Sequence, residues 1–226
     1  MKLAVVVPML NEERAIASTL RAIRKGAPQA QIIAADGGSN DASVAIARTL
    51  ADAVIVAACG RARQMNAGAV AAHGDALAFV HADTLVPADF ADQIDAALCD
   101  PMIVGGRFDL RLDVTSPAYR LLGVLISWRS RIMRSATGDQ AIFVRRELFE
   151  QLGGYRDIEI CEDVDFVRRV RRVGRFACLH AEVIASARRW QTHGFLRTVL
   201  RMWIIKSLFL LGVSPVRLKR HYRDTR

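Results

Sequence analysis

Apolar runs alternate with helical patterns through the first hundred residues of the chain. Continuous apolar segments occupy residues 3–7, 32–35, 54–57 and 76–80. Between them, apolar side chains recur three or four positions apart, as Ile16, Leu20 and Ile23 do, which is typical of helices with one buried face. Because unbroken apolar runs suit strands that are covered on both faces, this alternation predicts an α/β fold. We expect a mostly parallel, Rossmann-like central sheet flanked by helices.

The pattern changes after about residue 100. Residues 105–114 alternate apolar and polar side chains, which indicates an antiparallel or edge strand, and residues 141–144 predict another strand. Valines spaced three apart over residues 164–173 predict a helix that ends at Gly174. The first half therefore has the pattern of a nucleotide-binding sheet, and the second half is mixed.

The C-terminal segment is basic and amphipathic. The net charge of the chain is +9, and residues 188–226 hold ten Lys and Arg against one Asp, so the rest of the chain is neutral. Residues 195–213 are apolar but include three basic residues, and each charge near the centre of a spanning helix costs about 2.5–3.5 kcal/mol. We therefore expect a helical tail over residues 191–226 that lies on an anionic membrane surface rather than crossing it. A helix packed on the preceding domain is an equal alternative.

Composition adds a cellular context. Hydrophobic residues make up 52% of the 226-residue chain, enough for a full core. The four cysteines are scattered and form no CxxC pair, which favours a reducing cytoplasm and argues against structural zinc. The apolar start is interrupted by Pro8, so it is too short for a signal peptide and is expected to be a strand.

The segment His81-Ala82-Asp83 carries the strongest chemical signal. It follows the fourth apolar run, and side chains two positions apart on a strand point the same way. The carboxyl ends of strands in an open α/β sheet are where ligands bind, and one aspartate can hold a divalent cation that also contacts a phosphate. A strand end followed by an ordinary turn and helix cap is the alternative.

Three further segments follow the earlier strands. Pro8, Asn11 and Glu12 come after the first strand, where Asn11 could instead cap a helix with Glu12 in its first turn. Asp36 and Gly37 follow the second strand, where glycine lets a ligand approach the backbone and a carboxylate can bind a nucleobase or ribose. Residues 60–68, which include Arg63 and Asn66, open a helix after the third strand and could bind an anion or simply be solvated.

The second half contains a candidate catalytic base and a candidate site for a diphosphate and a sugar. Glu162 and Asp163 precede a helical pattern, where a carboxylate could deprotonate a hydroxyl or merely stabilise the helix start. Arg189 and Trp190, in the run Arg188-Arg189-Trp190, could bind a diphosphate and stack on a sugar, or could be the beginning of the basic tail.

The order and spacing of these segments resemble a known family. The motifs are P-M-L-N-E at 8–12, D-G-G-S-N-D at 36–41, G-R-A-R-Q-M-N-A-G at 60–68, H-A-D at 81–83, G-G-Y at 153–155, E-D at 162–163 and R-R-W at 188–190. Together they resemble a family 2 glycosyltransferase with the GT-A fold, over residues 3–215. The chain is most similar to the bacterial subgroup labelled arsenosugar-biosynthesis-type glycosyltransferases.

The resemblance implies a role for each motif residue. Asp163 would be the catalytic base, supported by Glu162, and Asp83 would bind the metal, Mg²⁺ or Mn²⁺. The residues implied to bind the nucleotide-sugar are Pro8, Asn11, Glu12, Asp36, Gly37, Arg63, Asn66, His81, Ala82, Asp83, Arg189 and Trp190. Two positions depart from the usual family pattern, because His81 stands for the first Asp of the metal motif and Gly37 for a second Asp after Asp36.

The resemblance also implies a domain division and an activity. A GT-A catalytic domain would cover residues 1–190, with a nucleotide-sugar half at about 1–100 and an acceptor half at about 101–190, and the basic tail would follow. The expected reaction is metal-assisted, inverting transfer of a sugar from a UDP-sugar to a hydroxyl acceptor, which could be lipid-linked or amphipathic. The enzyme would be cytoplasmic, or peripheral on the inner face of the cell membrane. A nucleotidyltransferase that makes nucleotide-sugars, or a non-catalytic protein that binds nucleotides or nucleic acid, is the alternative.

Overall fold

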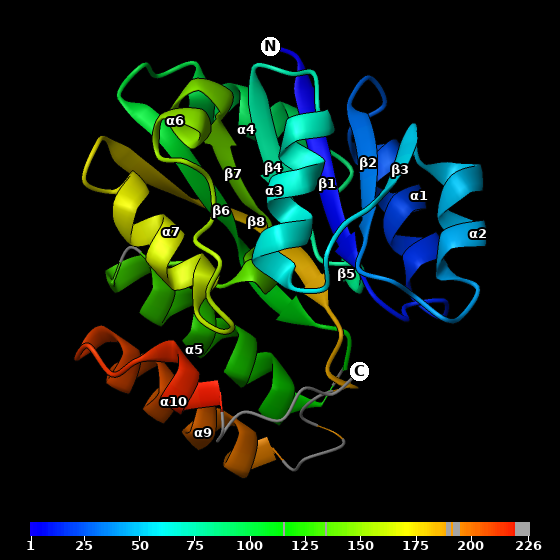
Figure 1. The fold of residues 1–226 in the computed structure, drawn as a ribbon. Helices are drawn as coiled ribbons and strands as arrows, with labels where there is room; N and C mark the ends of the chain where they lie inside the picture. The colour runs from blue at the N-terminus through cyan, green and yellow to red at the C-terminus, as the bar shows by residue number, and fades with distance from the viewer. Residues whose placement is uncertain (115, 134, 189–190, 192–194, 220–226) are drawn as a thin grey trace.

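A computed structural model describes residues 1–114, 116–133, 135–188, 191 and 195–219 (Figure 1). The strands are β1 (Leu3–Met9), β2 (Gln31–Asp36), β3 (Ala53–Val56), β4 (Ala76–Phe79), β5 (Thr84–Leu85), β6 (Ile103–Leu112), β7 (Ile142–Arg145) and β8 (Arg175–Ala185). The helices are α1 (Ile16–Gly26), α2 (Ser43–Leu50), α3 (Arg61–Ala71), α4 (Phe90–Leu98), α5 (Pro117–Ile132), α6 (Arg146–Gln151), α7 (Glu162–Val170), α9 (Phe195–Leu210) and α10 (Pro215–Lys219), with a 3₁₀ turn η1 (Gly138–Gln140).

The eight strands found among the described residues form one sheet in the order β3-β2-β1-β4-β7-β6-β8-β5. The first four pair in parallel, as expected from the alternating pattern, whereas β7 is antiparallel to both of its neighbours. β6 and β8 pair in parallel with each other, and both run in the same direction as the first four strands because β7 is antiparallel to β4 and to β6. The predicted α/β class with a mostly parallel sheet is confirmed.

The core lies on both faces of this sheet. Alternate residues of β1 point to opposite faces: Val5 and Val7 pack in the cluster that includes α1 and α4, and Val6 packs in the cluster that includes α3 and α7. A continuous apolar run is therefore what a strand in this position requires.

Two sequence expectations for elements were incomplete. α1 begins at Ile16 and not directly after Asn11, which has φ 54° and so does not cap the helix. β8 was not predicted, because exposed polar side chains interrupt its apolar pattern, and its neighbour β5 spans two residues.

The tail helix α9 lies against the sheet domain beside α5, as Figure 1 shows in orange and green. Ile205 of α9 packs with Ile160 and with Leu218 of α10. The Lys206 ammonium donates to Ser135 Oγ at 3.0 Å. Among the described residues, no helix has the length and apolar character that crossing a bilayer requires.

Candidate active site

A cavity of about 150 Å³ opens at the carboxyl ends of β1 and β4. Its walls come from the ends of β1 and β8, the starts of α3 and α7, the turn η1 and one face of α9. The titratable side chains that line it are Glu12, Arg61, His81, Asp83, Asp139, Cys161, Glu162, Asp163, Arg188 and Lys206. The edge of the sheet where ligands of α/β proteins bind is therefore where this chain gathers its charged groups.

The structure brings seven of the predicted residues together in the cavity wall. They are Pro8, Glu12, His81, Ala82, Asp83, Glu162 and Asp163. Five others lie outside the lining, namely Asn11, Asp36, Gly37, Arg63 and Asn66. Arg189 and Trp190 fall outside the described residues.

The backbone of the His81–Asp83 segment is held from both sides. Thr19 Oγ1 donates to the Ala82 carbonyl at 2.8 Å, and the Ser186 amide donates to the Asp83 carbonyl at 3.3 Å. A Cβ placed on Gly138 would lie 2.3 Å from His81 Nε2, so only glycine lets η1 approach the imidazole this closely. These contacts fix the position of the segment against η1.

Asp163 links η1 to the start of α7. Its Oδ2 accepts the Gly138 amide at 2.7 Å, and its Oδ1 accepts the Val164 amide at 2.7 Å. Burial raises the pKa of Asp163, while these two hydrogen bonds and the charge of Lys206 lower it. The carboxylate thus joins η1 to the start of α7 and also lines the cavity.

Lys206 is a site residue that the sequence patterns did not indicate. It is buried, lines the same cavity from α9, and has a pKa lowered to about 8, first by burial and then by the charge of Arg129. Asp163 and Asp139 act in the opposite direction. In sequence Lys206 is one basic residue in an apolar run, and nothing in that run marks it as facing inward.

The position of the Gln64 side chain explains why residue 37 is a glycine. The Gln64 amide nitrogen donates to the carbonyls of Met9 and Ala35, at 2.7 and 2.9 Å. A Cβ on Gly37 would lie 3.0 Å from the Gln64 amide carbon and nitrogen. The space beside Gly37 is therefore filled by a buried side chain that lines the cavity, and this crowding opposes any larger residue there.

Asp36 and Asn11 organise the loops next to the cavity. Asp36 accepts the amides of Gly38 and Ser39 and the Ser39 hydroxyl, the last at 2.5 Å. Asn11 accepts the Asn40 amide at 2.9 Å, and its own amide donates to Ser39 Oγ. The two strand-end loops are therefore tied to each other through this polar network.

Two other predicted residues contact the segment before α7. Arg63 pairs with Asp157 at 2.9 Å on the surface, and Asn66 makes two hydrogen bonds to the backbone of Tyr155. Both connect α3 to residues 155–157, so they join the two halves of the domain. At the opposite side of the cavity, Arg188 pairs with Glu12 at 3.1 Å.

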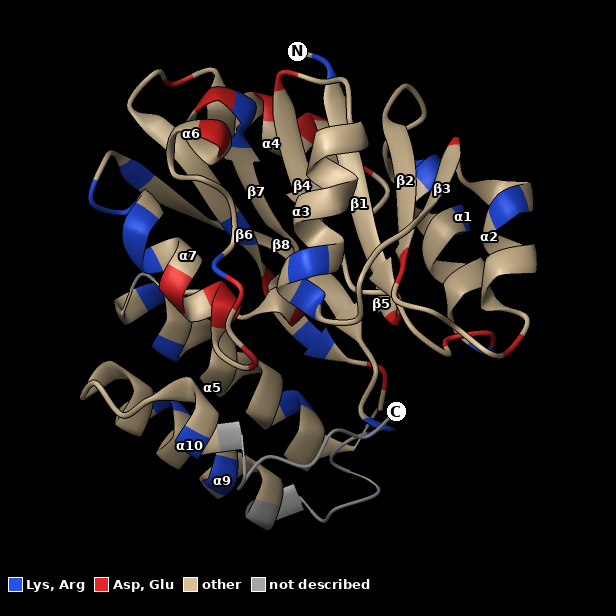
Figure 2. Ribbon diagram, viewed as in Figure 1, with Lys and Arg blue, Asp and Glu red and all other residues tan. Residues whose placement is uncertain are grey.

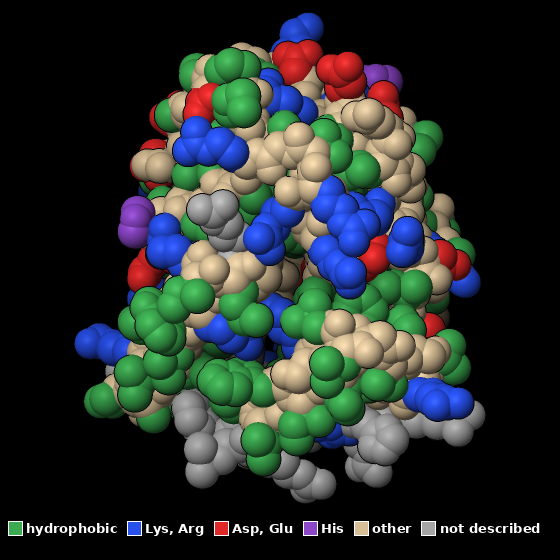
Figure 3. Space-filling model, turned by 90° about the vertical axis from the view of Figure 1, so that its left-hand side faces the viewer, with side chains coloured by type: hydrophobic (Ala, Val, Ile, Leu, Met, Phe, Trp, Pro, Cys, Tyr) green, Lys and Arg blue, Asp and Glu red, His purple; other side chains and the backbone are tan. Residues whose placement is uncertain are grey.

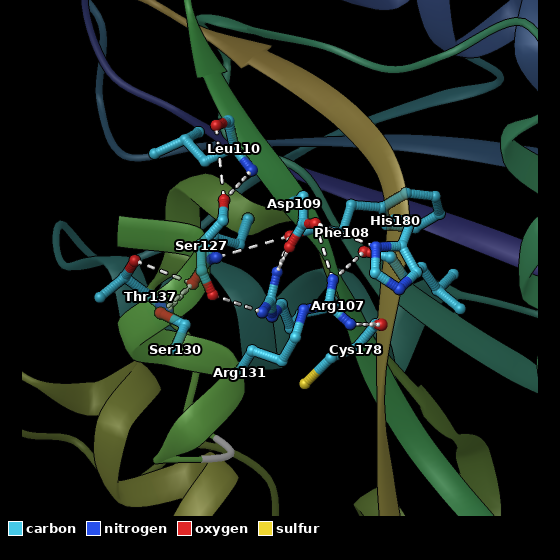
Figure 4. Close-up of polar contacts among 12 residues, drawn as sticks. Arg107, Phe108, Asp109, Leu110, Ser127, Ser130, Arg131, Thr137, Cys178 and His180 are labelled. Atoms are coloured by element: carbon cyan, nitrogen blue, oxygen red, sulfur yellow. Dashed lines mark hydrogen bonds and ion pairs between the residues drawn. The ribbon is translucent and has the colours of Figure 1, made fainter. Parts of the chain in front are cut away.

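A polar network that includes the fully buried Arg107 lies next to η1 (Figure 4). Arg107 is fully buried and pairs with Asp109, which also accepts from Arg131 of α5 at 2.7 Å. Next to it, Gln140 of η1 contacts α5 through Ser130 Oγ at 3.2 Å and β6 through its amide nitrogen. The Phe108 carbonyl accepts from both Arg107 and Gln140, so these ion pairs and the turn η1, which contacts Asp163, belong to one network.

The donors around the cavity fit a divalent metal that is shared with a substrate. Among the residues that the structure describes, no group of three or more His, Cys, Asp or Glu could hold an ion alone. Mg²⁺ is commonly bound by one or two carboxylates together with substrate phosphates. Asp83 in the cavity wall fits that mode and not a closed protein cage.

One family model and several solved structures match this chain. The sequence model described as Glycosyl transferase family 2 matches residues 4–151. The fold is similar to that of S. aureus TarS 1–349 in complex with UDP-GlcNAc, with a TM-score of 0.65, 18% identity, and coverage of 82% of this chain and 58% of that one. It is also similar to the mannosyltransferase PcManGT from Pyrobaculum calidifontis in complex with GDP-Man and Mn²⁺, with a TM-score of 0.66, 20% identity and coverage of 100% and 66%.

A third similar structure is glucosyl-3-phosphoglycerate synthase from Mycobacterium tuberculosis in complex with Mn²⁺, UDP and glucosyl-3-phosphoglycerate. It has a TM-score of 0.57 and 19% identity, over 80% of this chain and 70% of that one. The chain thus spans about 60% of the solved TarS fragment. A search of curated protein sequences found no match.

Proposed function

Since the chain belongs to glycosyl transferase family 2, we propose that it transfers a sugar from a UDP-sugar to a hydroxyl acceptor with inversion at the anomeric carbon. One observation carries this proposal: Asp83 and Asp163 lie in the wall of one cavity, at the carboxyl ends of β1 and β4. A metal-binding carboxylate and a poorly solvated base in one cavity are what a single-displacement transfer needs.

The donor would lie between the strand ends and the start of α3. Asp36 would bind the uracil or ribose, and Pro8, Asn11, Glu12, Gly37, Arg63 and Asn66 would shape the same pocket. Asp83, with His81 and Ala82 beside it, would hold Mg²⁺ or Mn²⁺, which when bound supplies charge neutralisation to the diphosphate leaving group. Arg189 and Trp190 are proposed to contact the diphosphate and the sugar.

Asp163 would act on the acceptor. Its carboxylate takes the proton of the acceptor hydroxyl as that oxygen attacks the anomeric carbon, while the bond from this carbon to the diphosphate oxygen breaks. Glu162, at the start of the same helix, would support this base. The two amides that donate to Asp163 hold the carboxylate at a defined angle and favour its charged form.

The acceptor half and the tail suggest where the reaction takes place. We propose a lipid-linked or amphipathic acceptor at the inner face of the cell membrane, because the basic amphipathic helix α9 lines the cavity. Residues 1–190 would be the catalytic domain and 191–226 its membrane-facing tail. The placement within the arsenosugar-biosynthesis-type subgroup is likewise proposed, on the order of the motifs alone.

A thermal-shift screen of the full chain tests the donor site. UDP-, GDP- and dTDP-sugars are compared, each with and without Mn²⁺. A ligand at 100 times its dissociation constant stabilises a protein by about 2.7 kcal/mol, which is a rise of about 5–10 °C for a domain of this size. A metal-dependent rise with the UDP-sugar is expected, and no rise with any nucleotide would refute the proposal.

A further inference from the structure

Helix α5 presents an apolar stripe to solvent. Leu121, Val124, Leu125, Trp128 and Ile132 are all exposed, and they recur at the spacing of one helix face. The opposite face, with Leu122 and Ser127, is buried against the sheet. In an ordinary surface helix the side chains that face solvent are polar, whereas those of α5 are mainly apolar.

Helix α9 repeats this arrangement. Leu200, Trp203, Ile204, Leu208 and Leu211 are exposed along one face that continues just past the end of the helix, and Leu200 is 62% and Leu211 81% exposed. The inner face carries Thr198, Met202 and Ile205, of which Ile205 packs on the domain and Met202 lines the cavity. The exposed apolar side chains of α9 are therefore a second stripe and not an extension of the core.

The two stripes belong to one surface. The guanidinium carbon of Arg129 in α5 lies 5.8 Å from the centre of the Trp203 ring in α9, so the helices are in contact. Figure 3 shows hydrophobic side chains gathered over the lower part of the molecule, which α5, α9 and α10 occupy in Figure 1. Single exposed apolar residues are ordinary, but many exposed apolar side chains gathered on two adjacent helices mark an interaction surface.

The charges of the same helices indicate which kind of partner this surface binds. The sequences of α5, α9 and α10 contain Arg and Lys but neither Asp nor Glu, and Figure 2 shows no acidic residue on them. Apolar stripes with only cationic charges between them complement a surface that offers hydrocarbon beneath anionic groups. An anionic lipid bilayer has that composition.

We propose that α5 and α9 together form a membrane-docking face that binds the surface of a bilayer containing anionic lipids. This builds on the membrane contact proposed above and assigns it to two helices, of which α5 belongs to the sheet domain. Because the inner face of α9 lines the cavity, docking through the outer face places the cavity about one helix diameter, roughly 10 Å, from the lipid headgroups. An acceptor carried by the bilayer then reaches the base without leaving the membrane surface.

Vesicle flotation of the full chain tests the docking face. Vesicles of phosphatidylcholine with 30% phosphatidylglycerol are compared with vesicles of pure phosphatidylcholine. The test variant combines Ile132→Ser with Leu200→Ser, two exposed positions on the stripes. The matched control combines Val56→Ser with Val70→Ser, which are 77% and 84% exposed and lie on β3 and α3.

The wild type and the control variant are expected to float with the anionic vesicles, and the test variant to lose about tenfold in partition coefficient. Arg120→Gln, at an exposed position of α5, removes one positive charge and is expected to weaken binding to anionic vesicles about fivefold at low salt without disturbing the core. Melting curves confirm that each variant is folded.

Three outcomes would overturn the docking face. The first is a folded wild type that ignores anionic vesicles, and the second is an equal loss of binding in the control variant. The third is a wild type that is a dimer in sedimentation velocity and binds no vesicles, together with a test variant that is a monomer. That result would assign the surface to a second copy of the chain. Sugar transfer is not measured, so a failure of the proposed enzyme activity would leave this result unaffected.

Discussion

Asp163→Asn separates the two roles that the structure suggests for this residue. Asp163 accepts two backbone amides, and it also faces the cavity in which we place the acceptor. An asparagine has one carbonyl oxygen, so it can keep one of the two hydrogen bonds, and it cannot take a proton at neutral pH. Asp165, one turn into the same helix, provides a matched control because it lies outside the cavity lining.

The substitution is expected to change the rate much more than the stability. A positioned base contributes about 10²–10⁴-fold to a rate, which corresponds to about 2.7–5.5 kcal/mol on the barrier. Losing one hydrogen bond costs about 1–3 kcal/mol of stability. In Asp163→Asn this cost is offset, because a carboxylate whose burial raises its pKa is removed. The variant should therefore stay close to the wild type in melting temperature while kcat falls by two to four orders of magnitude.

Asp165→Asn should do the opposite. Asp165 is buried and pairs with Arg169 at 2.8 Å and Arg156 at 3.3 Å, so neutralising it leaves a cation uncompensated. Breaking one side of a buried pair costs about 3 kcal/mol or more, which lowers the melting temperature by about 6 °C or more in a chain of this length. Turnover of the folded fraction should remain.

Steady-state turnover, donor binding by calorimetry and melting curves are measured for both variants. If Asp163→Asn keeps kcat within about threefold of the wild type, Asp163 is not the base and its role is confined to joining η1 to α7. If donor binding falls as steeply as kcat, the carboxylate acts on the donor and the mechanism proposed here is wrong.

Three further changes probe the metal, the charge of the base and the packing of the cavity wall. Asp83→Ala should abolish metal-dependent binding of the UDP-sugar in calorimetry, and an unchanged titration would exclude Asp83 as the metal ligand. Lys206→Met removes a charge that lowers the pKa of Asp163, so the acidic limb of the pH–kcat profile should move to higher pH. Lys206→Arg keeps the charge and should leave the limb where the wild type has it. If the limb does not move in Lys206→Met, Lys206 has a structural role only. Gly138→Ala places a Cβ 2.3 Å from His81 Nε2, so it should lower stability by about 1–3 kcal/mol and reduce kcat, and a variant with normal melting temperature and kcat would contradict the close approach seen here.

The local segments of the site were predictable because they depend on short-range order. Pro8, Asp83 and Asp163 follow or precede regular elements at set distances along the chain, and the carboxyl ends of parallel strands meet at one edge of a sheet. The structure places these residues in one cavity. It places Asp36 and Arg63 outside the lining, because Asp36 binds its own loop and Arg63 pairs with Asp157.

Other parts of the site depend on contacts between residues far apart in sequence. Lys206 reaches the cavity only because α9 packs beside α5, and Gln64 fills the space at Gly37 only because α3 crosses β1 and β2. β8 joins the sheet through its pairing with β6, although its own sequence alternates poorly. No periodicity within one segment carries that information, because the partner lies tens of residues away.

The fold class, the parallel direction of the first four strands and the positions of Asp36 and Asp83 at or just after strand ends could be predicted from the sequence alone. These follow from side-chain periodicity and from the handedness of crossovers, which are local rules. Which face of each helix is covered depends on the packing of the folded chain. For α5 and α9 it buried the polar Ser127 and Lys206 and left Trp128 and Trp203 exposed, because packing against the sheet and the cavity rim, rather than hydropathy alone, selects the inner face.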